Sequence, residues 1–397
     1  MKKIFKIGII IILLSIIALI FNKFHNVNII NKEQGAIKCN LKYKGLLGSI
    51  DFSIDEEYNY YIAYSNRVEV ISKHGKNYTL FKDDNLSIRA IEHYKNNLYF
   101  LSKNNVFCVN IKTKEKRILV NNIPNFGDYN NGVLKAVDNN LYISIGAATN
   151  SGIVGNDNEW LKENPYFHDI TPIEIILKGK NFGEEKTGAF VPNKTKNNKS
   201  QVVAAHFPGN SSLIIYHLNN DKMETYASGI RNVKAMDFTS KNKLLAVVGG
   251  MENRGLRPIK GDTDYIFEIT KNYWYGWPDY SGGDPISSPK FKGKNNEKID
   301  FILEKHPTNS PPAPIYQHKS LNSISSMAVD ENCILGKKDS IYFYDNKDNI
   351  IYELDKDNIL INRFTLVKPV KLGKMIFSKE QLVILERNTG CIYTFSK

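Results

Sequence analysis

Short runs of alternating apolar and polar residues fill most of the chain after residue 30. Each run is followed by a polar turn and a second run, as in residues 59–70, 97–109, 340–354 and 381–395. Further first strands begin near Leu141, Leu213 and Leu244. A period of two predicts β-strands, and each pair of runs predicts a hairpin.

Neighbouring hairpins recur at the spacing of a propeller blade, which is about 40 residues for four strands. Two larger gaps, near residues 150–210 and 250–340, hold inserts rich in proline and glycine. The sequence therefore predicts an all-β fold, a six-bladed β-propeller over residues 46–397 with long loops on one face. A β-sandwich is the structural alternative, but it does not predict repeated hairpins at this spacing.

The first residues combine positive charge with an apolar run. Lys2, Lys3 and Lys6 precede the apolar stretch from Ile7 to Phe21. When Ile4 and Phe5 are counted with it, the stretch is about long enough to span a thin bilayer with snorkelling lysines. The basic end is expected to stay in the cytoplasm, which places the rest of the chain outside. Residues 1–24 are thus predicted to be a signal anchor in the cell membrane, followed by a linker over 25–45. A cleaved signal peptide and a buried helix are the alternatives.

Charge and cysteine content indicate which binding partners, metals and disulfides the sequence favours. The net charge is +12, but lysines are scattered among Asn and Ile rather than gathered in an arginine-rich stripe. This pattern argues against nucleic-acid binding and favours weak attraction to anionic lipid or cell wall. The four cysteines form no CxxC pair, which argues against zinc. Two disulfides are possible outside the cytoplasm, and the alternative is that Cys108 and Cys391 are buried thiols.

Three segments interrupt the repeat, at residues 127–160, 227–232 and 249–283. They contain the peptides Gly127-Asp128-Tyr129, Gly229-Ile230-Arg231-Asn232, Gly249-Gly250-Met251 and Tyr275-Gly276-Trp277-Pro278. Together these peptides resemble the glucose/sorbosone dehydrogenase family of soluble quinoproteins. The resemblance covers roughly residues 95–320 and depends on the combination of Gly-x-Arg-Asn with Tyr-Gly-Trp-Pro. The family's fold is a six-bladed propeller, as the hairpin count predicts independently.

The resemblance implies an oxidoreductase that acts on sugars. Family members oxidise the C1 hydroxyl of an aldose and pass a hydride to pyrroloquinoline quinone (PQQ), which calcium holds on the top face. A general base takes the hydroxyl proton while a cation stabilises the charge that develops on the quinone. A sugar is therefore the expected substrate, and PQQ and calcium are the expected cofactors.

Four residues are expected beside the cofactor by this resemblance. Arg231 and Asn232 match the family's Arg-Asn pair, and Arg231 is expected to stabilise the reduced quinone. Asp128 lies in the first motif, and Lys234 adds a cation two residues after the Arg-Asn pair. The alternative for Arg231 is an ion pair with a loop carboxylate such as Asp264.

Backbone carbonyls are expected to hold the metal. Gly250 and Met251 match the family position whose carbonyls bind calcium, and carbonyl ligands do not depend on the side chain. The alternative is a tight turn that uses the glycine. Glu252 is a nearby carboxylate, for which a solvated surface role is the favoured interpretation.

Substrate contacts are predicted at Asn150 and Trp160, whose loop is expected at the rim of the top face, and at Trp277, because aromatic faces suit stacking against sugar C–H groups. Loop hydrogen bonding for Asn150 and Trp160, and a packing corner for Trp277, are the alternatives.

Tyr129 occupies the position of the family's catalytic histidine. A phenol with a pKa near 10 is a poor base at neutral pH. Two functions therefore remain open beside a purely structural role. One is a tethered sugar dehydrogenase, impaired at Tyr129, and the other is a non-catalytic propeller that binds a saccharide or a cell-envelope partner.

Overall fold

The computed structural model describes residues 15, 29–31, 37–366 and 368–397. Its regular structure is almost entirely β-strand, with two short 3-10 helices, η1 (Glu159–Lys162) and η2 (Lys294–Asn296). The predicted all-β class is confirmed, and the architecture is consistent with a β-propeller. The predicted anchor, apart from residue 15, lies outside the described residues. In the described part of the chain no helix is both long and apolar enough to cross a bilayer.

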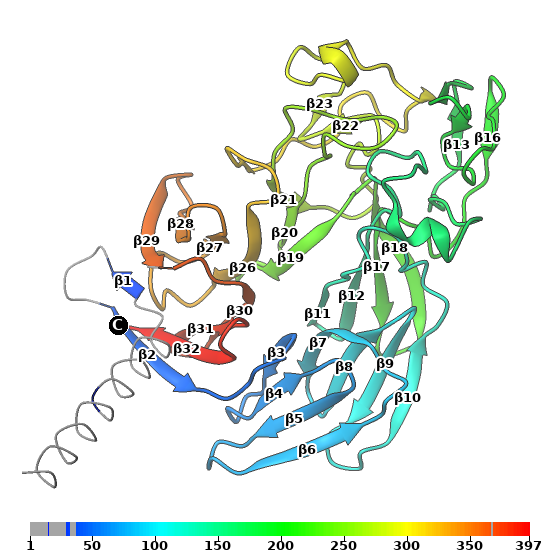
Figure 1. Cartoon of the computed structure of the whole chain (residues 1–397). Coiled ribbons are helices and arrows are strands. Elements are labelled where there is room, and N and C mark those ends of the chain that lie inside the picture. Colours follow the sequence, from blue (N-terminus) through cyan, green and yellow to red (C-terminus); the bar gives the residue numbers. More distant parts are fainter. Residues whose placement is uncertain (1–14, 16–28, 32–36, 367) are drawn as a thin grey trace, which may run out of the picture.

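Six antiparallel sheets of four or five strands follow one another through the described residues (Figure 1). The first contains β3 (Asp51–Ile54), β4 (Tyr60–Ala63), β5 (Arg67–Ile71) and β6 (Asn77–Lys82). The second contains β7 (Ile88–Tyr94), β8 (Asn97–Ser102), β9 (Asn105–Asn110) and β10 (Lys116–Val120). The third contains β11 (Leu134–Val137), β12 (Asn140–Ile145), β17 (Ser212–His217) and β18 (Lys222–Ser228).

The remaining three sheets complete the series. The fourth contains β19 (Val233–Phe238), β20 (Leu244–Val248), β21 (Tyr265–Ile269) and β25 (Tyr316–Gln317). The fifth contains β26 (Ile324–Asp330), β27 (Ser340–Asp345), β28 (Ile350–Leu354) and β29 (Leu360–Leu366), with β1 (Ile29–Asn31) at its edge. The last contains β30 (Leu372–Ser378), β31 (Gln381–Glu386), β32 (Cys391–Ser396) and β2 (Lys38–Tyr43).

The sheets form a closed ring around a central cavity. The innermost strands β3, β7, β11, β19, β26 and β30 contact one another in sequence, and β30 contacts β3. The first residues of all six line the same cavity, so all six run in one direction away from it. We call the end of the ring where these strands begin the entry end, and the opposite end the far end. Loops that follow an innermost strand, such as β3–β4 and β30–β31, therefore lie at the far end.

Two chain segments close the last sheet. β2 pairs with β32, with Lys38 opposite Ser396 and Leu41 opposite Tyr393. An early strand thus completes a sheet built from the end of the chain, and the segment predicted as a linker supplies that strand. The backbone N–H and C=O groups at the outer edge of β32 thereby gain hydrogen-bond partners.

The middle strands of each sheet are buried on both faces because they are packed between neighbouring sheets. All four residues of β4 are buried, and Tyr342, Phe343 and Tyr344 of β27 are fully enclosed. This double burial explains the near-continuous apolar runs in the first strands of the predicted hairpins. All four cysteines are free, and Cys108 and Cys391 are buried thiols, as the second interpretation of these residues predicts.

Two inserts extend from the third and fourth sheets (Figure 1). The first carries β13 (Ile175–Leu177), β14 (Asn181–Phe182), β15 (Thr187–Gly188) and β16 (Gln201–Val203). The second carries β22 (Tyr280–Ser281), β23 (Asp284–Pro285) and β24 (Leu303–Lys305). Because β13 pairs with both β16 and β24, the two inserts form one unit.

Candidate functional site

Arg231 is the centre of a charged cluster at the entry end, between β18 and β19. Its side chain is 3% exposed. The Nε atom donates to the carbonyl of Asn150 at 3.0 Å, and Nη1 donates to the carbonyls of Gly249, at 3.3 Å, and Gly250. Nη2 donates to the hydroxyl of Tyr129 and, at 2.9 Å, to Oδ1 of Asn150. All five guanidinium N–H groups are therefore directed at acceptors of the protein itself.

Tyr129 covers one face of this guanidinium. The ring centroid lies 4.0 Å from the guanidinium carbon of Arg231, within the range of a cation–π contact. The hydroxyl donates to Oε1 of Glu252 at 3.1 Å and accepts from Nη2 of Arg254 at 2.8 Å. Burial raises the pKa of Tyr129 to about 12, although the two nearby arginines oppose this rise. The phenol therefore stays protonated at neutral pH.

Glu252 and Arg254 join the cluster from the loop after β20. Oε1 of Glu252 lies 3.3 Å from Nη2 of Arg231, and Oε2 accepts from Nε of Arg254 at 2.6 Å. Arg254 also pairs with Asp128 and Asp157, both at 2.5 Å. Glu252, expected on the solvated surface, is only 22% exposed. Burial would raise its pKa, but the two arginines outweigh burial and lower the pKa to about 2.

This lowered pKa predicts a pH dependence of stability. A carboxyl whose pKa is lower in the folded state contributes stability above its unfolded pKa and loses it as the pH falls through its folded pKa. The contribution of Glu252 should therefore be complete at pH 6 and vanish between about pH 4.5 and 2. Melting curves of wild type and Glu252→Gln should differ clearly at pH 6 and converge near pH 2. An equal difference at both pH values would contradict an ionised, arginine-paired Glu252.

Further hydrogen bonds connect Asp128, Trp160 and Trp277 to the same cluster. Oδ1 of Asp128 accepts from Nε1 of Trp160 at 2.9 Å, and Oδ2 accepts from Nδ2 of Asn158 at 2.9 Å. Nε1 of Trp277 donates to the carbonyl of Asn150 at 3.1 Å, and both residues are buried. We use the name arginine cluster for the side chains that these contacts connect: Asp128, Tyr129, Asn150, Asp157, Asn158, Trp160, Arg231, Glu252, Arg254 and Trp277.

Gly250 lies in irregular backbone directly after β20, and its carbonyl accepts from Arg231. A Cβ atom at this position would lie 2.2 Å from the carbonyl oxygen of Thr263 and 2.7 Å from Cγ of Asp262, so only glycine fits. The amide of Met251 donates to Asp262 at 2.6 Å, and its side chain is buried in the core of the inserts. Within the described residues, no group of three or more His, Cys, Asp or Glu side chains could hold a metal ion.

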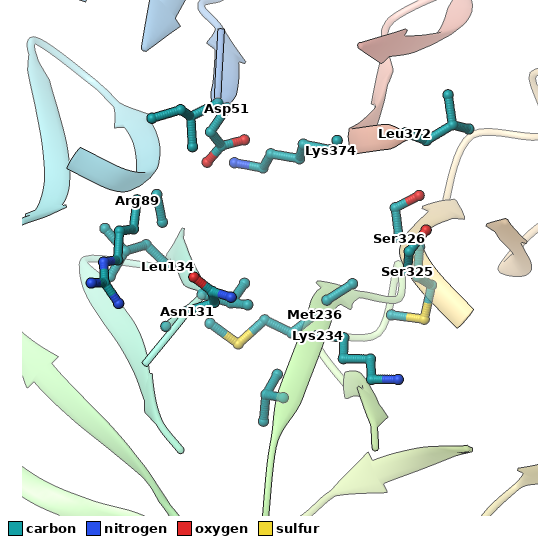
Figure 2. Close-up of a pocket in the computed structure, with 18 of the residues that line it drawn as sticks. Asp51, Arg89, Asn131, Leu134, Lys234, Met236, Ser325, Ser326, Leu372 and Lys374 are labelled. Carbon is teal, nitrogen blue, oxygen red and sulfur yellow. The ribbon is translucent and has the colours of Figure 1, made fainter. Parts of the chain in front are cut away.

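Asn232 and Lys234 line the central cavity, which has a volume of about 640 Å³. Nζ of Lys234 pairs with both carboxylate oxygens of Asp264, at 2.9 and 3.0 Å. Burial lowers the pKa of Lys234, while Asp264 opposes this. Figure 2 shows Lys374 directed towards Asp51 on another side of the cavity. The structure thus assigns the predicted site residues to two neighbouring places, the arginine cluster and the cavity rim.

Arg254 was not predicted from the sequence, nor was the pairing of Glu252. Both stand in the glycine-rich loop Gly249–Pro258, where charged residues ordinarily indicate solvent exposure. Their partners Asp128 and Tyr129 are more than one hundred residues earlier in the chain. No local pattern marks such contacts, and in the sequence only the family resemblance of the two loops indicates that they meet.

The ring of β-sheets is similar in fold to solved structures of PQQ-binding sugar dehydrogenases. No family model matches the sequence, and no curated protein matches it. Among solved structures, the chain is similar to an AA12 carbohydrate-active enzyme of Trichoderma reesei, with a TM-score of 0.63, 12% identity and coverage of 94% of this chain and 98% of that one. It is also similar to the PQQ domain of pyranose dehydrogenase from Coprinopsis cinerea, with a TM-score of 0.62, 8% identity and coverage of 94% and 98%.

A third similar structure is the PQQ-bound aldose sugar dehydrogenase of Streptomyces coelicolor, with a TM-score of 0.53, 13% identity and coverage of 92% of this chain and 99% of that one. The Trichoderma reesei enzyme also has a structure described as its calcium form. These similarities establish a fold like that of the glucose/sorbosone dehydrogenases, which the sequence motifs predict.

Proposed function

We propose that this chain is an extracytoplasmic binding protein with a six-bladed propeller, tethered to the cell membrane by residues 1–24. It has the fold of a sugar dehydrogenase, but its own side chains fill the place of the redox centre. The observation that carries this proposal is Arg231, whose side chain is 3% exposed and whose five N–H groups all have protein acceptors.

The residues present do not fit calcium and PQQ. The carbonyls of Asn150, Gly249 and Gly250 are oxygen ligands of the kind that calcium prefers, but they accept hydrogen bonds from the Arg231 guanidinium. A second cation at these carbonyls would be repelled by the first. Tyr129 stacks on the guanidinium, where a planar quinone would need access. The arginine cluster therefore does not support a redox step.

The cluster also lacks a base of suitable strength. A general base works best when its pKa lies near the working pH. Burial holds the pKa of Tyr129 at about 12, and the arginines hold that of Glu252 at about 2. Neither side chain is matched to take a proton from a sugar hydroxyl at neutral pH.

The central cavity offers a binding site of ligand size (Figure 2). Its lining includes the amides of Asn131, Asn232, Asn322 and Asn346. Ser326 also lines the cavity, and its buried Oγ has no hydrogen-bond partner among the described residues. Amides and hydroxyls of this kind suit the hydroxyl groups of a saccharide.

Two arginines on the cavity wall favour an acidic saccharide. Nη1 of Arg89 donates to the carbonyl of Asn130 at 2.8 Å, and Nε of Arg387 donates to the carbonyl of Ser49 at 3.2 Å. Neither forms an ion pair with another described residue. A guanidinium with free N–H groups recognises a carboxylate in a bidentate manner. We therefore infer that the ligand is a saccharide that carries a carboxylate.

The proposal is tested with the purified full chain in detergent. Titration with PQQ and calcium should give no bound-quinone absorption and no oxidation of aldoses. Calorimetry with an oligogalacturonide should show binding that neutral maltotetraose lacks, and Arg89→Gln should weaken it about tenfold or more. Arg117→Gln, an exposed arginine on β10, is the matched control. Quinone binding with aldose turnover would instead establish the dehydrogenase alternative.

A further inference from the structure

A second cavity, of about 710 Å³, opens where the fifth, last and first sheets meet. Its lining includes residues of the β3–β4 and β30–β31 loops, which follow innermost strands and so lie at the far end of the ring. The cavity is therefore well separated from the arginine cluster. Four exposed lysines line it: Lys42, Lys73, Lys379 and Lys397.

Tyrosines line the same cavity beside the lysines. Nζ of Lys379 lies 5.0 Å from the ring centroid of Tyr58, and Nζ of Lys42 lies 5.8 Å from that of Tyr43. The rings of Tyr43 and Tyr60 meet edge to face at 5.1 Å. Tyrosine rings are enriched at the headgroup level of bilayers, where one end of the side chain is apolar and the other is wet.

The lysine charges at this cavity are poorly neutralised. Lys42 and Lys397 form no ion pair with any described residue, and Lys379 donates to the backbone carbonyl of Glu56. Lys73 has a loose ion pair with Glu57 at 3.7 Å, in which both side chains are largely exposed. Glu380 also lines the cavity.

Strand β2 adds to the positive surplus. Residues 38–44 contain Lys38, Lys42 and Lys44 and no acidic residue, and all three lysines are exposed. Exposed lysines in this number attract an anionic surface, and each strengthens association by about fivefold.

The predicted tether enters the fold at the same sheets. β1 begins at Ile29 on the edge of the fifth sheet, and β2 begins at Lys38 on the edge of the last. Both sheets contribute residues to the second cavity. Ile29 is opposite Leu366 at the entry end of the fifth sheet, whereas Lys38 is opposite Ser396, which lines the second cavity. Of these two strands, β2 therefore begins beside the lysine-lined cavity.

We propose that the far end of the ring docks on an anionic phospholipid surface through this lysine and tyrosine cavity. The lysine ammonium groups bind lipid phosphates, and the tyrosines lie at headgroup depth. The entry end, with the arginine cluster and the mouth of the central cavity, then points away from the membrane. This inference depends on the tether in the proposed function, but not on the ligand of the central cavity.

An exposed cysteine provides the probe for this orientation. Cys333 lies in the β26–β27 loop between Asn332 and Ile334, which both line the second cavity, whereas Cys108 and Cys391 are buried. The full chain carrying Cys39→Ser is placed in nanodiscs of phosphatidylcholine, with or without phosphatidylglycerol. Labelling of Cys333 by a water-soluble maleimide should be at least about fivefold slower in the anionic discs, and high salt should remove the difference.

Charge variants decide whether the lysines cause the effect. Lys42→Gln/Lys73→Gln/Lys379→Gln should abolish the slower labelling, whereas Lys196→Gln/Lys199→Gln/Lys298→Gln, in the inserts, changes charge equally and should preserve it. Equal labelling in both kinds of disc, or the same response in both triple variants, would overturn the proposal. A chain that does not enter discs would refute the tether alone. Anionic vesicles are then added to it, and unchanged Cys333 labelling would refute docking.

Discussion

Replacing Arg231 by methionine should lower the free energy of unfolding by about 3 to 5 kcal/mol, because it leaves buried acceptors without a donor and removes a buried cation from an anionic partner. The carbonyls of Gly249 and Gly250 lose their donor, and Glu252, 3.3 Å away, keeps only Arg254 as a cationic partner. Unfolding in urea, followed by tryptophan fluorescence, measures the loss.

Two further variants provide a control for an exposed ion pair and a partial rescue of Arg231→Met. Arg67→Met removes a pair with Glu69 whose side chains are 34% and 33% exposed, and it should cost no more than about 1 kcal/mol. Adding Glu252→Gln to Arg231→Met should restore part of the loss, because a carboxylate that has lost one of its two arginine partners is then replaced by a neutral amide. If Arg231→Met costs as little as Arg67→Met, the guanidinium is not the internal cation that holds these loops together.

Melting curves with calcium test whether the Arg231 guanidinium excludes the metal. In wild type the Gly249 and Gly250 carbonyls accept hydrogen bonds from Arg231 and lose this donor only in Arg231→Met. Wild type should therefore melt at the same temperature with calcium as with a chelator. Stabilisation of wild type by calcium would show that the metal displaces Arg231 and would reopen the redox alternative.

The fold was predictable from the sequence because its signal is local and repeated. Each hairpin, such as that of β31 and β32, has its own apolar runs and polar turn, and the spacing between hairpins gives the sheet size. The closure by β2 was not predictable in the same way. Its six residues, Lys-Cys-Asn-Leu-Lys-Tyr, are mostly exposed and lack the apolar run of a middle strand. They pair with β32 more than 340 residues later, and no local pattern encodes that partner.

The sequence predicted which loops form the candidate site but not how their side chains bond to one another. The motif resemblance indicates that the loops of Tyr129, Arg231 and Gly250 meet, and the structure brings these residues into hydrogen-bond contact. The chemistry of the site depends on whether the N–H groups of Arg231 are free to bind a ligand or are bonded to protein acceptors. That outcome depends on Glu252 and Arg254, whose charges give no sign of burial in the sequence. A motif can therefore retain its position in a fold while its functional groups bond to one another.

The second large effect is expected at Asp279, directly after the Tyr-Gly-Trp-Pro motif. Its carboxylate is fully buried and accepts from Nη2 of Arg257 at 2.7 Å. It also accepts from the amides of Ile302, at 3.0 Å, and Leu303, at 2.9 Å, and Nε2 of His306 lies 3.0 Å away. Asp279 thus ties the motif to β24, which in turn pairs with β13 of the other insert.

Asp279→Asn should lower the free energy of unfolding by about 3 to 5 kcal/mol, because it leaves the charge of Arg257, 3% exposed, without a carboxylate. Asp284→Asn is the matched control. Its carboxylate is 51% exposed in a pair with Lys290, so its loss should cost no more than about 1 kcal/mol.

Hydrogen exchange then locates the effect of Asp279→Asn. Protection should fall first in β13 and β24, while the inner strand β7, in a distant sheet, keeps its protection in native conditions. This pattern would show that the Trp277-Pro278-Asp279 corner serves to join the inserts. Unchanged exchange in β13 and β24 would contradict that role and would return Trp277 to the list of candidate ligand contacts.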